Sequence, residues 1–252
     1  DPEMSRGLGD VYKRQEKLLY ENSKHALQSD NIIAITNRHL CSRPFMEQLE
    51  RVCKLHPHAI VLREKDMPEA EYLSLARDVI ALCKKYDVQC MLHSFINVAM
   101  ELEHPYIHLP LPILEAYVKK NVSGNISTGM SKSTDNYQQF FKVIGTSVHS
   151  VEDAIKAEQL GATYMTAGHI FATDCKKGLP PRGLDFLKNV CDAVGIPVYA
   201  IGGINIASGD DSTASDSPST YDAMPDISVP RLSEVMECGA AGGCIMSGMM
   251  RV

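Results

Sequence analysis

The segment GHIFATDCKKG, from Gly168 to Gly178, concentrates reactive side chains at the end of a strand-like run. It contains one imidazole, one carboxylate, one thiol and two amines, at His169, Asp174, Cys175, Lys176 and Lys177. Lysines suit an anionic ligand, and imidazole suits proton transfer near neutral pH. No sequence neighbour marks the thiol as an activated nucleophile, and the spacing is not that of a metal site. We therefore expect anion binding from this segment.

A second charged group lies in LREKD, from Leu62 to Asp66. Arg63 and Lys65 alternate along a strand-like run, so they point to one face and Glu64 points to the other. Two interpretations remain open. The two cations bind an anion, with Arg63 better suited to a bidentate grip, or they belong to a structural ring of Arg–Glu ion pairs.

Four histidines also follow or end strand-like runs: His93, His108, His149 and His169. Each could be a general acid–base group or a hydrogen-bonded residue of the wall, and spacing alone does not choose between these roles. Together with the cations, they suit a small anionic substrate and proton-transfer chemistry.

Glycines follow two strand-like runs of apolar residues near the end of the sequence. AIGGI contains Gly202 and Gly203, and CIMSGMM contains Ser247 and Gly248. Backbone N–H groups at such positions bind phosphate after the last two strands of many parallel barrels. Glycine also ends strands without any function, but both sites at the appropriate strands favour a phosphate site.

The elements that position these residues alternate along the chain. Helical patterns follow all but the last of eight strand-like runs, at residues 32–37, 59–66, 88–94, 106–112, 142–150, 163–171, 197–204 and 242–250. Alternation of this kind predicts a parallel sheet with right-handed crossovers, and eight units predict a (β/α)8 TIM barrel that lacks its final helix. A doubly wound open sheet is the alternative, but ITNRHL after the first run has no glycine fingerprint.

We interpret residues 1–15 as a non-native read-through segment and residues 16–252 as a single domain. Two polar segments, near 121–139 and 208–230, are expected to be flexible insertions because they contain few apolar residues. Ser150 and Gly161 are expected to begin and end one helix. A missing last helix would leave apolar surface exposed on the first and last strands.

The composition argues against a nucleic-acid-binding protein and against a membrane protein. The net charge is −6, and there is no basic run with interleaved aromatic residues, so we expect no nucleic-acid partner. No apolar run is long enough to span a membrane and no signal peptide is visible, so we expect a cytoplasmic protein without a membrane partner. Eight scattered cysteines fit reduced thiols.

Several of these segments together resemble the thiamine-phosphate synthase superfamily, from about Ile32 to the chain end apart from the insertions. They are LREKD, GTSVHSVEDAIKAEQLGATY, GHIFATDCKKG, GIPVYAIGGI and ECGAAGGCIMSG. GHIFATDCKKG is the most specific of them and is similar to the TenI branch, the thiazole tautomerases. The resemblance implies a (β/α)8 barrel with a phosphate site at strands seven and eight.

This sequence departs from the synthase pattern at several positions, and these departures favour the TenI branch over the synthases. Synthases carry magnesium-binding acids after strands three and four. Here the first position is His93–Ser94, and no acid follows His108–Leu109 within PLPIL. Val61 and Cys175 replace a glutamine and a threonine of the synthases. A diphosphate leaving group would be poorly stabilised without its metal ligands, so we expect no metal and no cofactor.

The resemblance therefore implies an isomerase of thiamine biosynthesis that aromatises a thiazole carboxylate phosphate. It implies His149 of SVHS as the catalytic group, with Arg63, Lys65, His93 and Lys176 binding the substrate. Gly202, Gly203, Ser247 and Gly248 are the expected phosphate site.

The alternatives are a thiamine-phosphate synthase, a transferase, and a non-catalytic protein that binds a phosphorylated ligand. Members of the family commonly associate, which makes a homo-oligomer a further expectation.

Overall fold

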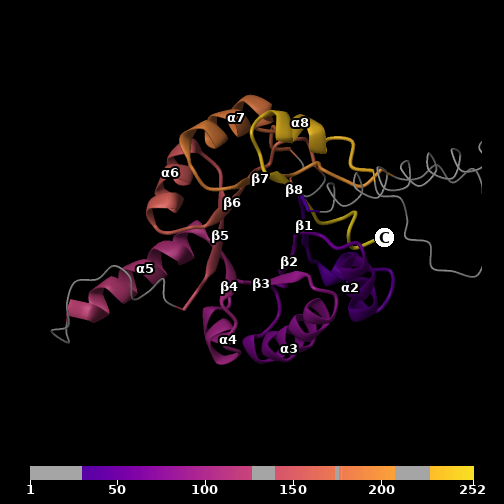
Figure 1. Ribbon diagram of the computed structural model, residues 1–252, viewed down its shortest axis with the longest axis vertical. Helices are drawn as coiled ribbons and strands as arrows, with labels where there is room; N and C mark the ends of the chain where they lie inside the picture. Colours follow the sequence, from indigo (N-terminus) through magenta and orange to yellow (C-terminus); the bar gives the residue numbers. More distant parts are fainter. Residues whose placement is uncertain (1–29, 127–139, 174–175, 177, 208–227) are drawn as a thin grey trace, which may run out of the picture.

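The computed structural model describes residues 30–126, 140–173, 176, 178–207 and 228–252. Within these residues, eight parallel strands pair in sequential order and β1 closes on β8. Helices alternate with the strands and form a ring around them (Figure 1). The predicted (β/α)8 barrel is thus confirmed, and the open sheet is excluded.

The strands are short and consist largely of apolar residues. They are β1 (Ile32–Ile35), β2 (Ala59–Leu62), β3 (Gln89–His93), β4 (Tyr106–Pro110), β5 (Val143–Val148), β6 (Tyr164–Gly168), β7 (Val198–Ile201) and β8 (Gly242–Ile245). The helices are η1 (Arg38–Leu40), α2 (Phe45–Lys54), α3 (Glu69–Lys85), α4 (Ile96–Glu101), α5 (Leu111–Ile126), α6 (Val151–Gln159), α7 (Gly183–Ala193) and α8 (Leu232–Glu237).

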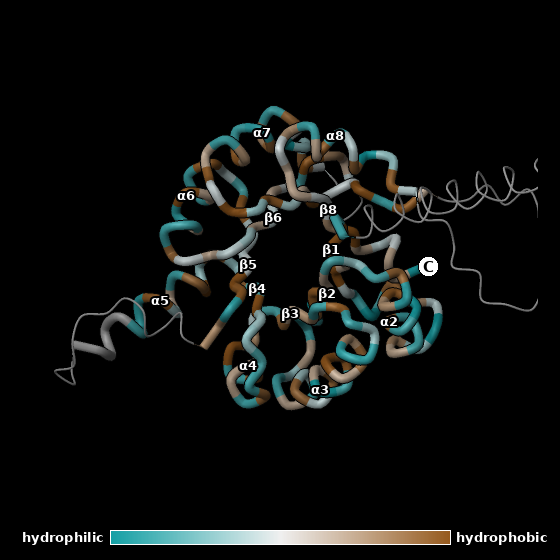
Figure 2. The backbone as a smooth tube through the Cα atoms, in the orientation of Figure 1, coloured by the Kyte–Doolittle hydropathy of each residue, from teal (hydrophilic) through white to brown (hydrophobic). Residues whose placement is uncertain are grey.

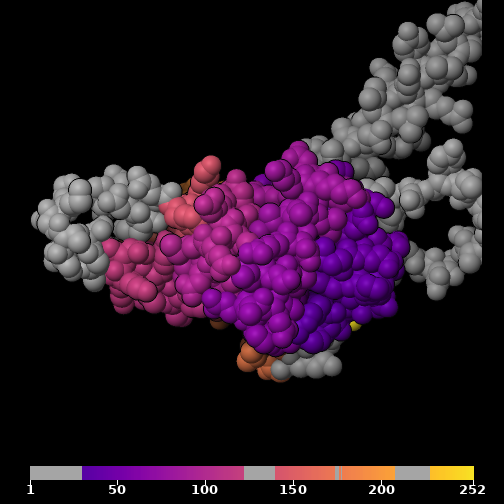
Figure 3. Space-filling model, turned by 90° about the horizontal axis from the view of Figure 1, so that it is seen from below, coloured from indigo at the N-terminus to yellow at the C-terminus, as the bar shows by residue number. Residues whose placement is uncertain are grey.

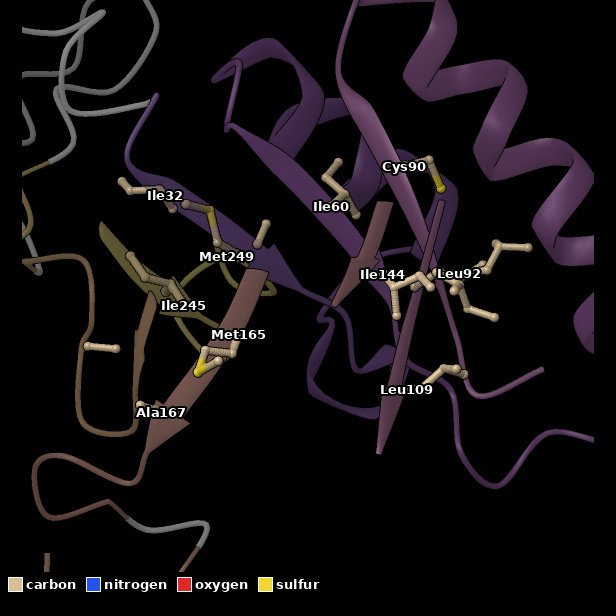
Figure 4. Close-up of a cluster of buried hydrophobic side chains, with 14 of the residues drawn as sticks. Ile32, Ile60, Cys90, Leu92, Leu109, Ile144, Met165, Ala167, Ile245 and Met249 are labelled. Carbon is tan, nitrogen blue, oxygen red and sulfur yellow. The ribbon is translucent and has the colours of Figure 1, made fainter. Parts of the chain in front are cut away.

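Side chains alternate between the inside and the outside of the barrel along each strand, and this alternation creates two hydrophobic clusters. The outer cluster, between strands and helices, includes Ile60, Leu92 and Met165 (Figure 4). The inner cluster includes Val61 and Met91, each next to an outward residue in sequence. Each helix carries both polar and apolar residues, as Figure 2 shows, because one side faces the barrel and the other faces solvent. His93 of β3 and His108 of β4, which pair with each other in register, continue the inward series.

Helix α6 begins and ends where the sequence predicts. The Ser150 side chain accepts a hydrogen bond from the Asp153 N–H at 3.0 Å and caps the helix. Gly161 adopts a φ of 87° just after the helix, a conformation that costs glycine little. The cap fixes the backbone immediately after His149.

The first insertion starts later than expected. Helix α5 continues through Asn121 to Ile126 and extends away from the barrel (Figure 1). The Asn121 amide donates to the Tyr117 carbonyl at 2.9 Å, within the helix. In Figure 3, which shows the molecule from below, the magenta surface of α5 extends to the left of the purple surface of the first half of the chain. Residues 127–139 lie outside the described part of the chain, as do 1–29, which include the expected read-through.

The second insertion lies largely in residues 208–227, also outside the description. The residues on either side of it are hydrogen-bonded to each other, since the Ala207 N–H donates to the Ser228 carbonyl at 2.7 Å.

The apolar surface expected on the first and last strands is not exposed. Ile32 of β1 is 3 % exposed and Ile245 of β8 is fully buried. A turn at residues 246–251 follows β8 and contributes the buried side chains of Met249 and Met250. Figure 4 shows Met249 beside Ile32 and Ile245. The expectation of exposure was wrong because this turn packs against the core.

A buried tyrosine joins the ends of two strands that carry candidate site residues. Tyr72 of α3 is fully buried and stacks on Phe95, with ring centroids 4.1 Å apart. Its hydroxyl donates to the Leu62 carbonyl at 2.7 Å and accepts from the His93 N–H at 3.0 Å. It therefore holds β2 and β3 in place just before Arg63 and at His93.

We expect Tyr72→Phe to lower the free energy of unfolding by about 1–3 kcal/mol, because it leaves two buried backbone groups without their partner. Urea denaturation measures this change. Tyr86→Phe is the control, since the hydroxyl of this half-buried residue bonds to the Glu50 carboxylate near the surface, where water can replace it. Equal stability of Tyr72→Phe and wild type would show that the bridge contributes nothing.

Candidate functional site

The sequence predicts Arg63 and Lys65 on one strand, but β2 ends at Leu62, so Arg63 follows the strand and Lys65 lies in the next turn. Their charges still lie close enough to the buried rings of His93 and His108 to lower the pKa of both. Glu64 is 2 % exposed and lies in the layer between strands and helices. Its carboxylate accepts from the Thr36 hydroxyl at 2.7 Å and from the Arg38 guanidinium at 3.0 Å. The ion pair is therefore between Glu64 and Arg38. Among the described residues Arg63 takes no part in this Arg–Glu pair, and its role in binding an anion stays a prediction.

Three cations, Arg63, Lys65 and Lys176, lie close to one another beyond the ends of β2 and β6. No described carboxylate forms a salt bridge with Arg63 or Lys65 in residues 30–126, 140–173, 178–207 and 228–252. Partial burial lowers the pKa of Lys65, and the nearby positive charges of Arg63 and Lys176 lower it further. Lys176 comes from the loop after β6, so the loop approaches β2 across the mouth. An anion is the ligand that this group of uncompensated cations would bind.

His93 and His108 form a buried pair of neutral imidazoles beside these cations. Their rings stack with centroids 5.6 Å apart. Burial is the main cause that lowers the pKa of His93 to about 2 and of His108 to about 3, and the charges of Arg63 and Lys65 add to it. Both rings are therefore uncharged at neutral pH and can only exchange hydrogen bonds with a ligand or with their neighbours.

His108 is held on both ring nitrogens. Its Nδ1 lies 2.9 Å from the Tyr164 hydroxyl, and its Nε2 lies 2.9 Å from the Ser147 hydroxyl. Ser147 in turn accepts from Thr166 at 3.0 Å. These contacts favour the wall interpretation of His108. In His93, by contrast, Nδ1 lies 2.8 Å from the Ser94 hydroxyl, and no described residue forms a hydrogen bond with Nε2.

His149 has a defined tautomer. Its Nδ1 lies 2.8 Å from the Gly168 carbonyl oxygen, which can only accept a hydrogen bond, so Nδ1 carries the proton. In the neutral ring Nε2 then has a free lone pair. The register of β5 and β6 pairs Val148 with Ala167, which places the next residues, His149 and Gly168, opposite each other. The side chain is exposed and accessible to a substrate.

His169 is buried and makes its side-chain contact within the loop after β6. It is 7 % exposed, and its Nε2 lies 3.4 Å from the Leu179 carbonyl within the loop after β6. Its own carbonyl accepts from the Arg182 N–H at 2.9 Å. The structure therefore supports a structural role for this histidine. Asp174, Cys175 and Lys177 lie outside the described residues.

The two glycine segments lie beside neighbouring loops. Gly202 and Gly203 have φ values of 100° and 70°, and a Cβ at Gly203 would lie 2.6 Å from the Ala172 carbonyl oxygen. A Cβ at Gly248 would lie 3.2 Å from the Ile206 nitrogen, so the loops after β7 and β8 are adjacent. Ser247 lies in the turn that follows β8. The loop geometry agrees with the predicted phosphate site, whose role remains a prediction.

The residues at the mouth do not fit magnesium. Mg²⁺ prefers carboxylate oxygens, whereas the expected positions after β3 and β4 hold His93, Ser94 and Leu109. Among the described residues there is no group of three or more His, Cys, Asp or Glu that could hold a metal ion. The described helices also include none that is long and apolar enough to cross a membrane.

Comparison with known proteins gives a consistent family. Residues 32–216 match the family described as thiamine monophosphate synthase. The chain is 34% identical over 178 residues to a putative thiamine-phosphate synthase 2 of Aquifex aeolicus, covering 71% of this chain and 87% of the relative. It is 30% identical over 175 residues to a thiamine-phosphate synthase of Caldanaerobacter subterraneus, covering 69% and 75%.

A solved structure supports the same fold. The thiamine phosphate pyrophosphorylase of Pyrococcus furiosus superposes with a TM-score of 0.61 at 24% identity and covers 89% of both chains.

The neutral histidine pair generates a pH dependence of stability. Unfolded histidine titrates near 6.5, and burial chiefly lowers the pKa of His93 and His108 far below that. Below about pH 6.5 the unfolded chain thus binds more protons than the folded one, and stability falls as the pH falls. We expect a slope of at most about 1.4 kcal/mol per pH unit for each imidazole.

Urea denaturation at several pH values between about 5 and 8 measures this slope. His108→Gln should flatten it, whereas the control, His56→Asn at an exposed position, should not. An unchanged slope in His108→Gln would show that this ring does not stay neutral in the folded state.

Proposed function

The chain belongs to the thiamine monophosphate synthase family, and within this family of thiamine biosynthesis we propose that it is an isomerase, a thiazole tautomerase. Its substrate would be a thiazole carboxylate phosphate with an exocyclic double bond. The observation that carries the proposal is the hydrogen bond from His149 Nδ1 to the Gly168 carbonyl, which leaves Nε2 as a base at the open end of the barrel.

The reaction requires one proton to leave a ring carbon and one proton to reach the exocyclic carbon. His149 Nε2 accepts the first proton while the electron pair of the broken C–H bond moves into the ring. The exocyclic double bond then takes up a proton from the imidazolium, and the ring becomes aromatic. No proton, electron or other reactant is gained overall. The Gly168 carbonyl stabilises the positive charge that forms on the imidazole.

The cations at the mouth supply the binding energy. Arg63 and Lys65 would hold the substrate carboxylate, and Lys176 would approach from the β6 loop. The neutral His93 would donate or accept one hydrogen bond without adding charge. The glycine segments at Gly202, Gly203, Ser247 and Gly248 would bind the phosphate through backbone N–H groups.

A transferase is the second candidate, and the names of the relatives favour it over the isomerase. A thiamine-phosphate synthase would join hydroxymethylpyrimidine diphosphate to thiazole phosphate and release diphosphate. The described residues argue against this reaction, because they contain no group of three or more His, Cys, Asp or Glu that could hold the metal that would stabilise the leaving diphosphate.

We expect His149→Ala to reduce tautomerase turnover by about 10²- to 10⁴-fold, the usual contribution of a general base. The assay follows the ultraviolet change on aromatisation, with magnesium and with a chelator. Turnover of wild type should be the same in both. His56→Asn is the matched control for loss of a histidine outside the mouth.

Magnesium-dependent release of diphosphate by wild type would instead establish the transferase. Binding of the thiazole phosphate without turnover of either kind would establish a binding protein.

We further expect Arg63→Lys to raise the KM by about 10- to 100-fold, because it loses a charge-assisted bond worth about 1.5–3 kcal/mol. Initial rates at varied substrate concentration give this value. Arg77→Lys, in an exposed salt bridge with Glu101, should leave the KM unchanged. Wild-type kinetics in Arg63→Lys would mean that the guanidinium does not bind the substrate.

A further inference from the structure

Arg231 contacts two of the loops that surround the expected phosphate site, although nothing in the sequence marked it. Its guanidinium lies over the Phe171 ring at 4.3 Å from the centroid. Its Nη1 donates to the Gly203 carbonyl at 3.3 Å. Phe171 follows β6 and Gly203 follows β7, so one side chain connects the two loops.

The hydrogen bond to Gly203 controls the direction of a peptide unit. In a planar trans peptide the C=O and the N–H point in opposite directions. Because the Gly203 carbonyl points toward Arg231, the Ile204 N–H points away from it. The preceding unit is fixed in the same way, since the Gly202 carbonyl accepts from the Phe171 N–H at 3.1 Å. The N–H groups of Gly203 and Ile204 are therefore directed away from both partners.

The glycine at position 203 makes this peptide easy to turn. Its φ of 70° is open to glycine at little cost, and a Cβ there would lie 2.6 Å from the Ala172 carbonyl oxygen. A glycine peptide held by a single outside contact depends on that contact for its orientation. Among the described residues, Arg231 makes the side-chain hydrogen bond to the Gly203 carbonyl.

The backbone around Arg231 is well anchored. Val229 and Leu232, on either side, are each 5 % exposed and belong to the outer core. The Leu232 N–H donates to the Val229 carbonyl at 3.0 Å. The neighbouring Ser228 carbonyl accepts from the Ala207 N–H. The guanidinium is thus presented from a fixed point.

We propose that Arg231 is a positioning residue for phosphate: it holds the Gly203–Ile204 peptide with its N–H toward the bound anion. The proposal rests on the phosphorylated substrate of the proposed function, but phosphate binding can be measured without turnover. Arg231 also carries a role that lysine cannot fill, because only the planar guanidinium stacks on Phe171 while donating to a carbonyl.

The test uses inorganic phosphate as the probe, with its dissociation constant measured by titration calorimetry on the full chain. We expect Arg231→Ala and Arg231→Lys each to weaken phosphate binding by about tenfold, roughly the loss of one hydrogen bond to a charged group. Phe171→Leu should weaken it less, in the same direction. In the tautomerase assay the variants should raise the KM and leave kcat within about twofold.

Arg77→Ala, which removes an exposed arginine on α3, is the control and should bind phosphate like wild type. Wild-type phosphate affinity in Arg231→Ala would overturn the proposal, as would a wild type that binds no phosphate. A lower thermal midpoint with unchanged affinity would also overturn it, since that is the result of a purely structural role. Full affinity in Arg231→Lys would show that charge alone matters and would contradict the positioning role.

The proposal and the proposed function can fail separately. If wild type binds phosphate and Arg231→Ala does not, but no turnover is found, the positioning role stands and the tautomerase fails. If turnover depends on His149 while phosphate affinity is the same in Arg231→Ala and wild type, only the positioning role fails.

Discussion

Alternation of side chains around a closed parallel barrel is the constraint on which the rest of this molecule depends. Closure gives every strand an inside and an outside, so residues two apart share a face. Just beyond β2, the Glu64 and Asp66 carboxylates both pair with Arg38. Arg63 and Lys65 have no salt bridge among the described residues, and their charges act on the buried rings of His93 and His108.

The chemistry follows from which groups remain neutral in that positive field. His93 and His108 stay uncharged because they are buried beside cations. His149 is exposed, and its proton is placed by the Gly168 carbonyl. In the proposed function, fixed charges would bind the substrate anion, and the ring of His149, whose tautomer is set by a backbone contact, would move the proton.

Residue patterns predicted the barrel and the cap at Ser150. These features depend on the local periodicity of apolar residues and on hydrogen bonds between near neighbours, and both can be recognised in the sequence. The partner of His149 could not be predicted, because it depends on the register between β5 and β6. Tyr72 and Arg231 were missed for a similar reason: each acts on backbone groups far away in sequence. Burial likewise distinguishes His108, which is buried, from His149, which is exposed, although the two look alike as strand-end histidines.

The most direct test of this account is the tautomer of His149, observed by ¹⁵N nuclear magnetic resonance of the imidazole nitrogens in the free protein above neutral pH. His149→Gln assigns the signals. The account predicts that Nδ1 carries the proton and Nε2 has the shift of an unprotonated nitrogen. A ring protonated on Nε2 would remove the base from the mouth and contradict the proposed mechanism.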